Sequence, residues 1–227
     1  MRNLVFSDNE WPQKSALIII DQINNVLSQK EHCSVFLTGG RGAAKVYSFL
    51  AKELKNCKGQ IFYYLGDERC VNENHPDSNF RMILETLFPD GLPNGQILYK
   101  MYDDADGSES AAYKYELIIP AIPDIVLLGL GDDGHIASLF PETKWQQSDG
   151  KKVTTAVSPV NGIQRITITK QVIDSTSEII VFAAGVSKQK IISELSGNLE
   201  KSDLPSSLAL RGLWLLDESA AVGLDKT

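Results

Sequence analysis

The feature that most restricts the fold of this sequence is a repeated alternation of short apolar runs with amphipathic helical patterns. The runs lie at 34–40, 60–69, 96–101, 124–130, 152–160, 165–173, 177–185 and 213–221, and the helical patterns at 12–27, 46–54, 80–87, 110–118 and 186–195. Strands that alternate with helices predict an α/β fold with a mostly parallel sheet flanked by helices. No Pro-, Gly- or Ser-rich linker divides the 227 residues, so one domain over 1–227 is expected.

Composition excludes several classes of partner. The 22 basic and 29 acidic side chains give a net charge of −7, so no diffuse basic field attracts nucleic acid or an anionic membrane. The apolar runs are far shorter than the roughly 20 residues that span a bilayer. Three cysteines without C-x-x-C spacing, and a beginning without a signal-peptide pattern, predict a cytoplasmic protein.

The first glycine-rich turn follows the run that ends at Thr38. Gly39, Gly40, Arg41 and Gly42 precede a helical pattern, where backbone N–H groups, the helix N-terminus and one arginine favour an anion such as phosphate. The spacing to Lys45 is not that of a Walker loop. A turn that merely packs tightly is the alternative.

Three charged residues, Asp67, Glu68 and Arg69, follow the next apolar run. In a parallel sheet, ligands bind outside the carboxyl ends of the strands, so these side chains are candidates for a site. They could equally reach solvent or pair with one another in a structural salt bridge. The residues alone leave both interpretations open.

The run at 124–130 leads into Gly129-Leu-Gly131-Asp-Asp-Gly134, which fits the dinucleotide-binding pattern G-x-G-x-x-G. Asp132 and Asp133 would place negative charge where a pyrophosphate docks, so no dinucleotide cofactor is expected. His135, two residues after Asp133, suits a general base, because a carboxylate can fix the imidazole tautomer. Ser138 lacks the G-x-S-x-G context of an esterase nucleophile and is interpreted as a helix-start cap.

Two further cations lie near expected strand ends, Arg165 in "RITIT" and Lys188 in "AAGVSKQK". Each is an ordinary surface charge or, together with Arg41 and Arg69, part of a local anion site in an acidic protein. A metal site is not expected, because the three histidines share no ligand spacing.

Five segments, in order, carry a resemblance to a known family. "GLGDDGHIASLFP" (129–141) resembles the signature of the 6-phosphogluconolactonases, and "GDERCVNENHPDSN" (66–79) resembles their second signature. "QRITIT" (164–169), "AAGVSKQKII" (183–192) and "LPSSLAL" (204–210) resemble the family's remaining landmarks. The likeness spans nearly the whole chain.

The resemblance implies a Rossmann-like fold of the sugar-phosphate isomerase/lactonase type. It implies hydrolysis of 6-phospho-D-glucono-1,5-lactone to 6-phosphogluconate, a step of the oxidative pentose phosphate pathway, with no cofactor and a small-molecule partner only. His135 would be the general base and Asp133 its orienting carboxylate, while Asp67 would position a sugar hydroxyl or Arg69. The residues expected to hold the phosphate or share the oxyanion are Gly39, Gly40, Arg41, Arg69, Arg165 and Lys188. A monomer or a weak homo-oligomer is expected.

Two departures from related patterns matter. The family usually has Ser-Gly-Gly-Ser-Thr-Pro where this chain has Thr38-Gly-Gly-Arg-Gly-Ala43, so Arg41 is expected to replace missing hydroxyls. The similar glucosamine-6-phosphate deaminases continue to Phe-Asn-Glu-Pro, where this chain has Ser-Leu-Phe-Pro and its next acid is Glu142. A deaminase/isomerase-like enzyme and a non-catalytic sugar-phosphate-binding protein are the alternatives. Asp132 is given no role beyond contact with solvent.

Overall fold

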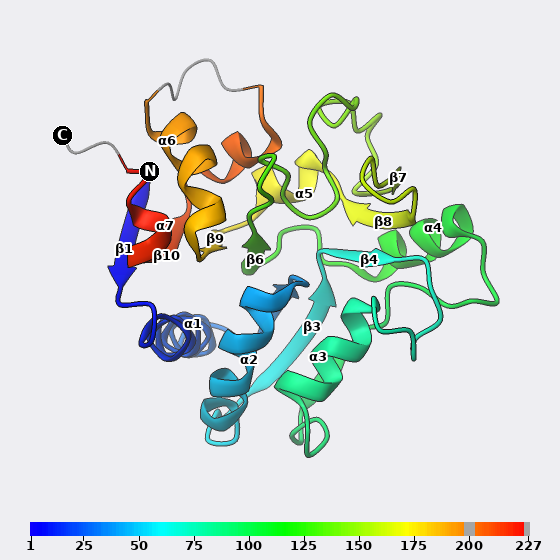
Figure 1. Ribbon diagram of the computed structural model, residues 1–227. Coiled ribbons are helices and arrows are strands. Elements are labelled where there is room, and N and C mark those ends of the chain that lie inside the picture. Colours follow the sequence, from blue (N-terminus) through cyan, green and yellow to red (C-terminus); the bar gives the residue numbers. More distant parts are fainter. Residues whose placement is uncertain (198–202, 225–227) are drawn as a thin grey trace.

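A seven-stranded sheet forms the centre of the structure, a computed structural model that describes residues 1–197 and 203–224. Across the sheet the strands follow the order β1 (Arg2–Phe6), β10 (Leu213–Asp217), β9 (Glu178–Ala183), β6 (Ile125–Gly129), β2 (His32–Leu37), β3 (Gln60–Leu65) and β5 (Gln96–Leu98). Every pairing in it is parallel. The predicted parallel α/β fold is therefore confirmed (Figure 1).

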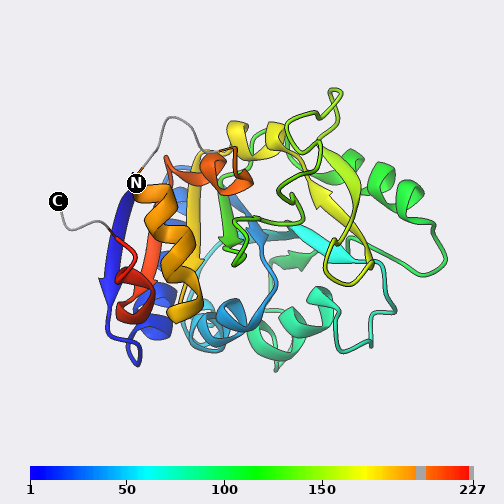
Figure 2. The same ribbon diagram turned by 45° about the horizontal axis from the view of Figure 1, so that its top comes forward.

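Helices cover both faces of this sheet. The helices are α1 (Trp11–Leu27), α2 (Arg41–Leu54), α3 (Asn79–Leu87), α4 (Ser108–Ile118), α5 (Lys170–Ser175), α6 (Gln189–Gly197) and α7 (Glu218–Ala221), with 3-10 turns η1 (Val186–Lys188) and η2 (Pro205–Ala209). α1 packs against α2, and α2 against α3. α6 lies in front of the sheet in Figure 2 and α1 behind it. This two-sided cover explains why strands such as β6 are apolar throughout.

A second, three-stranded antiparallel sheet stands beside the first, with the order β4 (Asp67–Arg69), β8 (Gln164–Ile168) and β7 (Val153–Val157). The charged residues 67–69, expected to follow an apolar strand, form β4 instead. The chain leaves β3 at Gly66, whose N–H donates to the Leu37 carbonyl and whose carbonyl accepts from the Ile168 N–H. The run at 165–173 likewise ends as a strand at Ile168 and continues as α5. The sequence reading also missed β1, a five-residue edge strand with a largely exposed surface.

Asp124, just before β6, links β6 to β2. Its buried carboxylate accepts hydrogen bonds from the backbone N–H (2.9 Å) and the hydroxyl (2.8 Å) of Ser34, and pairs with Lys30. Burial raises the pKa of Asp124, but the bonds from Lys30 and Ser34 outweigh burial and hold that pKa below its ordinary value. The carboxylate is therefore ionised at neutral pH and joins the two central strands.

We expect Asp124→Ala to lower the free energy of unfolding by about 2–3 kcal/mol, because it leaves the buried Ser34 donors without an acceptor. Since its pKa is lower in the folded protein, the stabilisation is complete above the ordinary pKa and is lost as the pH falls through the folded value. Urea unfolding at several pH values measures both effects. Asp90→Ala, which removes an exposed ion pair with Lys55, should leave the unfolding free energy nearly unchanged; equal losses would contradict the assignment.

Candidate active site

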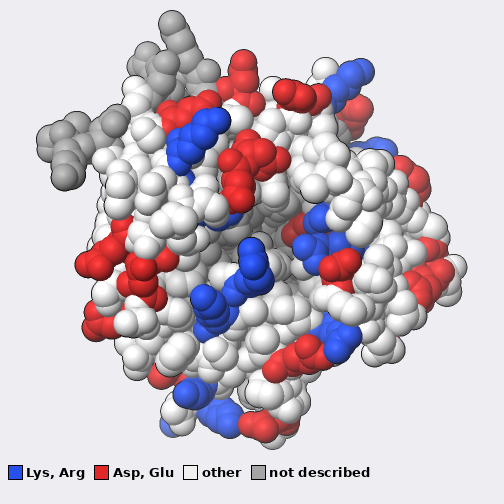
Figure 3. Space-filling view, in the orientation of Figure 1, with Lys and Arg blue, Asp and Glu red and all other residues white. Residues whose placement is uncertain are grey.

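One cleft of about 720 Å³ opens at the carboxyl ends of the parallel strands. Figure 3 shows the hollow near the middle of one face, with basic side chains around it. Segments that follow β1, β2, β6 and β9 line it, together with residues of β4 and β8 and the last residue of β10. Of the site residues expected from the sequence, the cleft is lined by Gly39, Gly40, Arg41, Asp67, Arg69, His135, Arg165 and Lys188, with Asp133 behind His135.

His135 and Asp133 form a hydrogen-bonded pair in the loop after β6. The imidazole Nδ1 lies 2.5 Å from Asp133 Oδ1, which also accepts the His135 backbone N–H at 3.1 Å. Because Nδ1 faces the carboxylate, Nε2 is the nitrogen left for a ligand. Gly131 makes the pair possible: a Cβ there would lie 2.1 Å from His135 Nδ1 and 2.5 Å from Asp133 Oδ1.

Ser138 is not the helix cap that the sequence suggested, since residues 131–141 contain no helix. Its buried hydroxyl instead donates to Asp67 Oδ2 at 2.6 Å, and its backbone N–H donates to Thr167 Oγ1 at 3.1 Å. These bonds fasten the His135 loop to both β4 and β8. The Ser138 N–H and hydroxyl in this glycine-rich loop are thus hydrogen-bonded to distant parts of the chain rather than within a helix.

Asp67, Arg69 and Arg165 share one face of the small sheet. Arg69 and Arg165 are cross-strand partners in the β4–β8 pairing, and Asp67 lies two residues from Arg69, so alternation places all three on that face. Asp67 Oδ2 lies 3.5 Å from Arg165 Nη1. Of the two roles expected for Asp67, contact with Arg69 is not seen among the described residues, since Arg69 donates to the Asp77 carbonyl at 2.5 Å; contact with a sugar hydroxyl stays a prediction.

Among the described residues, one ion-paired carboxylate, Asp67, stands beside the two arginines. Arg165 is buried with only 13% of its side chain exposed, and one carboxylate, Asp67, pairs with it. Burial lowers the pKa of Arg165, Asp67 opposes that effect, and the like charge of Arg69 adds to it. The buried Nε atoms of both arginines have no partner within the described residues. Two adjacent guanidinium groups with spare donors suit an anionic ligand.

The sequence left open whether Glu68 reaches solvent or forms a structural contact; the structure shows a structural contact. It points away from Asp67 and is buried, and it accepts from the backbone N–H groups of Arg69 (2.7 Å), Asn79 (2.8 Å) and Phe80 (2.7 Å). Burial raises its pKa, although these bonds oppose the shift. Glu68 thus binds the N-terminus of α3.

Asn79, which the sequence reading did not single out, connects this arrangement to the glycine loop. Its side-chain amide donates to the Asp67 carbonyl at 2.9 Å. It lies so close to Gly39 that a Cβ there would be 1.9 Å from Asn79 Oδ1. The Ser-Asn pair at the end of the second signature was the one feature of the sequence that could have identified Asn79 as a residue of the site. The glycine loop is therefore set by a contact with α3 as well as by its own sequence.

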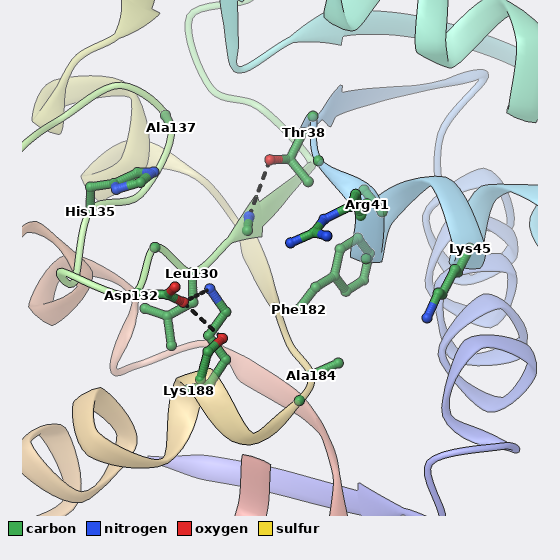
Figure 4. A pocket seen from close by; sticks show the side chains of 18 of the residues that line it. Thr38, Arg41, Lys45, Leu130, Asp132, His135, Ala137, Phe182, Ala184 and Lys188 are labelled. Atoms are coloured by element: carbon green, nitrogen blue, oxygen red, sulfur yellow. Dashed lines mark hydrogen bonds and ion pairs between the residues drawn. The ribbon is translucent and has the colours of Figure 1, made fainter. Parts of the chain in front are cut away.

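Lys188 lies in η1, after β9, and faces the loop after β6. Its Nζ lies 2.5 Å from Asp132 Oδ1, which also accepts from the Ser187 hydroxyl at 3.0 Å. Asp132, for which the sequence indicated no role beyond contact with solvent, is the ion-pair partner of a cleft lysine (Figure 4). Asp217, also missed, is buried and accepts the Gly185 N–H through both carboxylate oxygens at 2.9 and 2.8 Å, which holds the turn before Lys188.

Arg41 and Lys45 lie on the first turns of α2 at the cleft wall. Figure 4 shows the Arg41 side chain directed into the pocket. In the part of the chain that the structure describes, the side chains of Arg41 and Lys45 make no hydrogen bond or ion pair; only the Lys45 backbone carbonyl is engaged, by the Ser48 hydroxyl. Both charges are thus available to a ligand, and Lys45 extends the cation set beyond the sequence expectation.

Neither a metal cluster nor a membrane span is found in residues 1–197 and 203–224. No three His, Cys, Asp or Glu side chains there are grouped to hold an ion, and no helix there has the length and apolarity to cross a bilayer.

We expect Gly131→Ala to separate His135 from Asp133, because its Cβ would overlap both side chains. The downfield proton resonance of an Nδ1–H bonded to a carboxylate should be present in the unmodified protein and lost in the variant. Gly107→Ala is the matched control, since a Cβ there meets nothing within 4 Å. An unchanged resonance in Gly131→Ala would contradict the close approach described for this loop.

Comparison with known proteins gives a consistent set of relatives. A 6-phosphogluconolactonase of a Nostoc species is 32% identical, over 94% of this chain and 96% of its own. The crystal structure of 6-phosphogluconolactonase from Thermotoga maritima is 27% identical, with a TM-score of 0.80 and coverage of 96% and 99% of the two chains. A monomeric glucosamine-6-phosphate deaminase, 22% identical, shares the fold with a TM-score of 0.81, covering 97% of this chain and 99% of that one.

A family model for glucosamine-6-phosphate isomerases/6-phosphogluconolactonase matches residues 7–214. That range contains all the cleft residues discussed above except Asp217. The chain therefore belongs to the glucosamine-6-phosphate isomerase/6-phosphogluconolactonase family.

Proposed function

We propose that this protein hydrolyses 6-phospho-D-glucono-1,5-lactone to 6-phospho-D-gluconate. The observation that carries the proposal is the His135–Asp133 pair at the wall of a cleft rich in cations. A base beside an anion-binding surface suits an ester that carries a phosphate. Relatives named 6-phosphogluconolactonase, matched over nearly the full chain, support the same reaction.

In the proposed reaction His135 acts on water. With Nδ1–H donated to Asp133, the neutral imidazole presents an unprotonated Nε2, which takes a proton from water as the oxygen attacks the lactone carbonyl. The tetrahedral intermediate collapses with cleavage of the bond to the ring oxygen, and the His135 Nε2–H returns its proton to that oxygen. Asp133 stabilises the imidazolium between the two transfers.

The cations divide between two tasks. Arg165 and Arg69 share a face with Asp67, which is bonded to the His135 loop through Ser138, so we assign them to the developing oxyanion or to the phosphate. Lys188 and Arg41, with the Gly39 and Gly40 amides, complete the phosphate clamp. Asp67 holds Arg165 in place and leaves its other donors for substrate.

The residue beside His135 favours hydrolysis over amino-sugar chemistry. Phe140 packs on His135 with ring centroids 5.1 Å apart, and the Arg165 guanidinium lies 5.9 Å from the Phe140 ring centroid. Glu142, the next acid along the chain, is exposed and is not among the cleft residues. A second carboxylate from this segment, which ring opening of an amino sugar would use, is therefore not supplied beside His135.

We expect His135→Gln to lower kcat/KM for the lactone by about 10²–10⁴-fold, the range typical of general acid–base help. The assay follows fresh 6-phosphogluconolactone with and without protein and subtracts spontaneous hydrolysis. A circular dichroism spectrum checks that the variant folds. Unchanged kcat/KM in a folded variant would exclude His135 as the base, and ammonia release from glucosamine 6-phosphate by the unmodified protein would favour the deaminase alternative.

We expect Lys188→Ala to raise KM for the phosphorylated lactone by at least about tenfold, because a charge-assisted bond to phosphate is lost. Hydrolysis of gluconolactone without the phosphate should change little. Steady-state kinetics on the two substrates make the comparison. Equal losses on both would remove Lys188 from the phosphate clamp.

A further inference from the structure

Lys188 already has an ion-pair partner, Asp132, at the wall of the cleft. Its ammonium group is 2.5 Å from Asp132 Oδ1, and only 19% of the lysine side chain is exposed, against 65% of the aspartate side chain. The lysine is therefore held inside the cleft wall, while its partner stands mostly in solvent. An anion that enters the cleft meets Lys188 with a carboxylate already bound to it.

The two residues come from neighbouring strands, so their approach is fixed by the sheet. Asp132 follows β6 and Lys188 follows β9, which are hydrogen-bonded neighbours in the sheet. Asp217 holds the Gly185 turn before Lys188 independently of Asp132. The backbone turn that carries Lys188 therefore has support apart from the ion pair, whereas Asp132 is held by Lys188 and Ser187.

Asp132 is charged when the pair forms. Burial raises its pKa, but the bonds from Lys188 and Ser187 outweigh burial and hold the pKa below its ordinary value. A phosphate dianion on Lys188 would then lie beside a carboxylate that shares the same ammonium. Like charges at such a distance repel, so the aspartate must move into solvent or weaken the bound phosphate.

We propose that Asp132 is an internal competitor for Lys188, which weakens binding of the phosphate group and speeds release of the phosphorylated product. The inference rests on the proposed function, in which Lys188 contacts phosphate. Hydrolysis converts the neutral lactone ring into a carboxylate, so the product carries one more negative charge than the substrate. The negative charge of Asp132 therefore repels the product more strongly than it repels the substrate. The competition by Asp132 keeps the affinity of the cations for phosphate low enough for the product to dissociate, while the substrate still binds.

The test is Asp132→Asn, which keeps the shape of the side chain and removes its charge. Calorimetric titration of inorganic phosphate and of 6-phosphogluconate should give dissociation constants about 3- to 5-fold lower than in the unmodified protein, because an exposed ion pair contributes modestly. Product inhibition should become stronger by a similar factor. Asp132→Glu, which restores the charge, should return both values toward those of the unmodified protein.

Two controls isolate the pair. Asp90→Asn removes one negative charge from an exposed ion pair outside the cleft and should leave phosphate binding unchanged. In a Lys188→Ala background, Asp132→Asn should no longer tighten binding. If Asp132→Asn weakens binding, Asp132 positions Lys188 rather than competing for it; if binding is unchanged, the pair has no bearing on the ligand. Either result overturns the proposal.

The calorimetric arm does not depend on turnover. Tighter phosphate binding by Asp132→Asn together with no lactone hydrolysis by the unmodified protein would refute the proposed function and leave the competition at Lys188 in place. Lactone hydrolysis by the unmodified protein, with unchanged phosphate binding in Asp132→Asn, would support the proposed function and refute the competition at Lys188.

Discussion

Asp67 lies where three parts of the chain meet. Its buried carboxylate accepts from Ser138 in the His135 loop and pairs with Arg165 on β8, and its backbone carbonyl accepts from Asn79 at the start of α3. The cleft exists in its present form because one acid satisfies these partners at once. Removal of that acid would leave the Ser138 loop without its bond to β4 and Arg165 without its carboxylate, so His135 and the cations would no longer be positioned relative to each other.

This arrangement also explains how an acidic protein presents an anion site. The net charge of −7 gives no general attraction for phosphate, and the cleft depends on how each cation is partnered. Arg165 pairs with Asp67, which also accepts from Ser138, and Lys188 pairs with Asp132. The Arg41 side chain points into the pocket and has no ion-pair partner in the described chain. The neighbours of each cation, rather than the net charge of the protein, determine how strongly that cation attracts an anion.

The sequence indicated which residues reach the cleft, because they follow expected strands, but of the contacts between them it indicated only the local ones. His135 and Asp133 are two residues apart, so their pairing could be inferred from the segment itself. Ser138 and Asp67 are 71 residues apart, and Lys188 and Asp132 are 56 apart; the sheet order brings them together, and no periodicity reveals it. β4 was not predicted as a strand for the same reason, since its partner β8 lies about a hundred residues later. The apolar runs specified the parallel sheet because burial on both faces requires them.

The fold by itself does not select the reaction, because a glucosamine-6-phosphate deaminase has the same fold at a TM-score of 0.81. A parallel sheet fixes where loops emerge, and the side chains on those loops determine the chemistry. Phe140 is the telling position here: its ring occupies the side of His135 toward Arg165, so Asp133 is the carboxylate in hydrogen-bond contact with the imidazole. In the proposed reaction, His135 as base, Asp133 as orienting acid and a set of cations are sufficient for water to attack an activated ester. A proton shuttle between two carbons would need a further acid beside the same histidine.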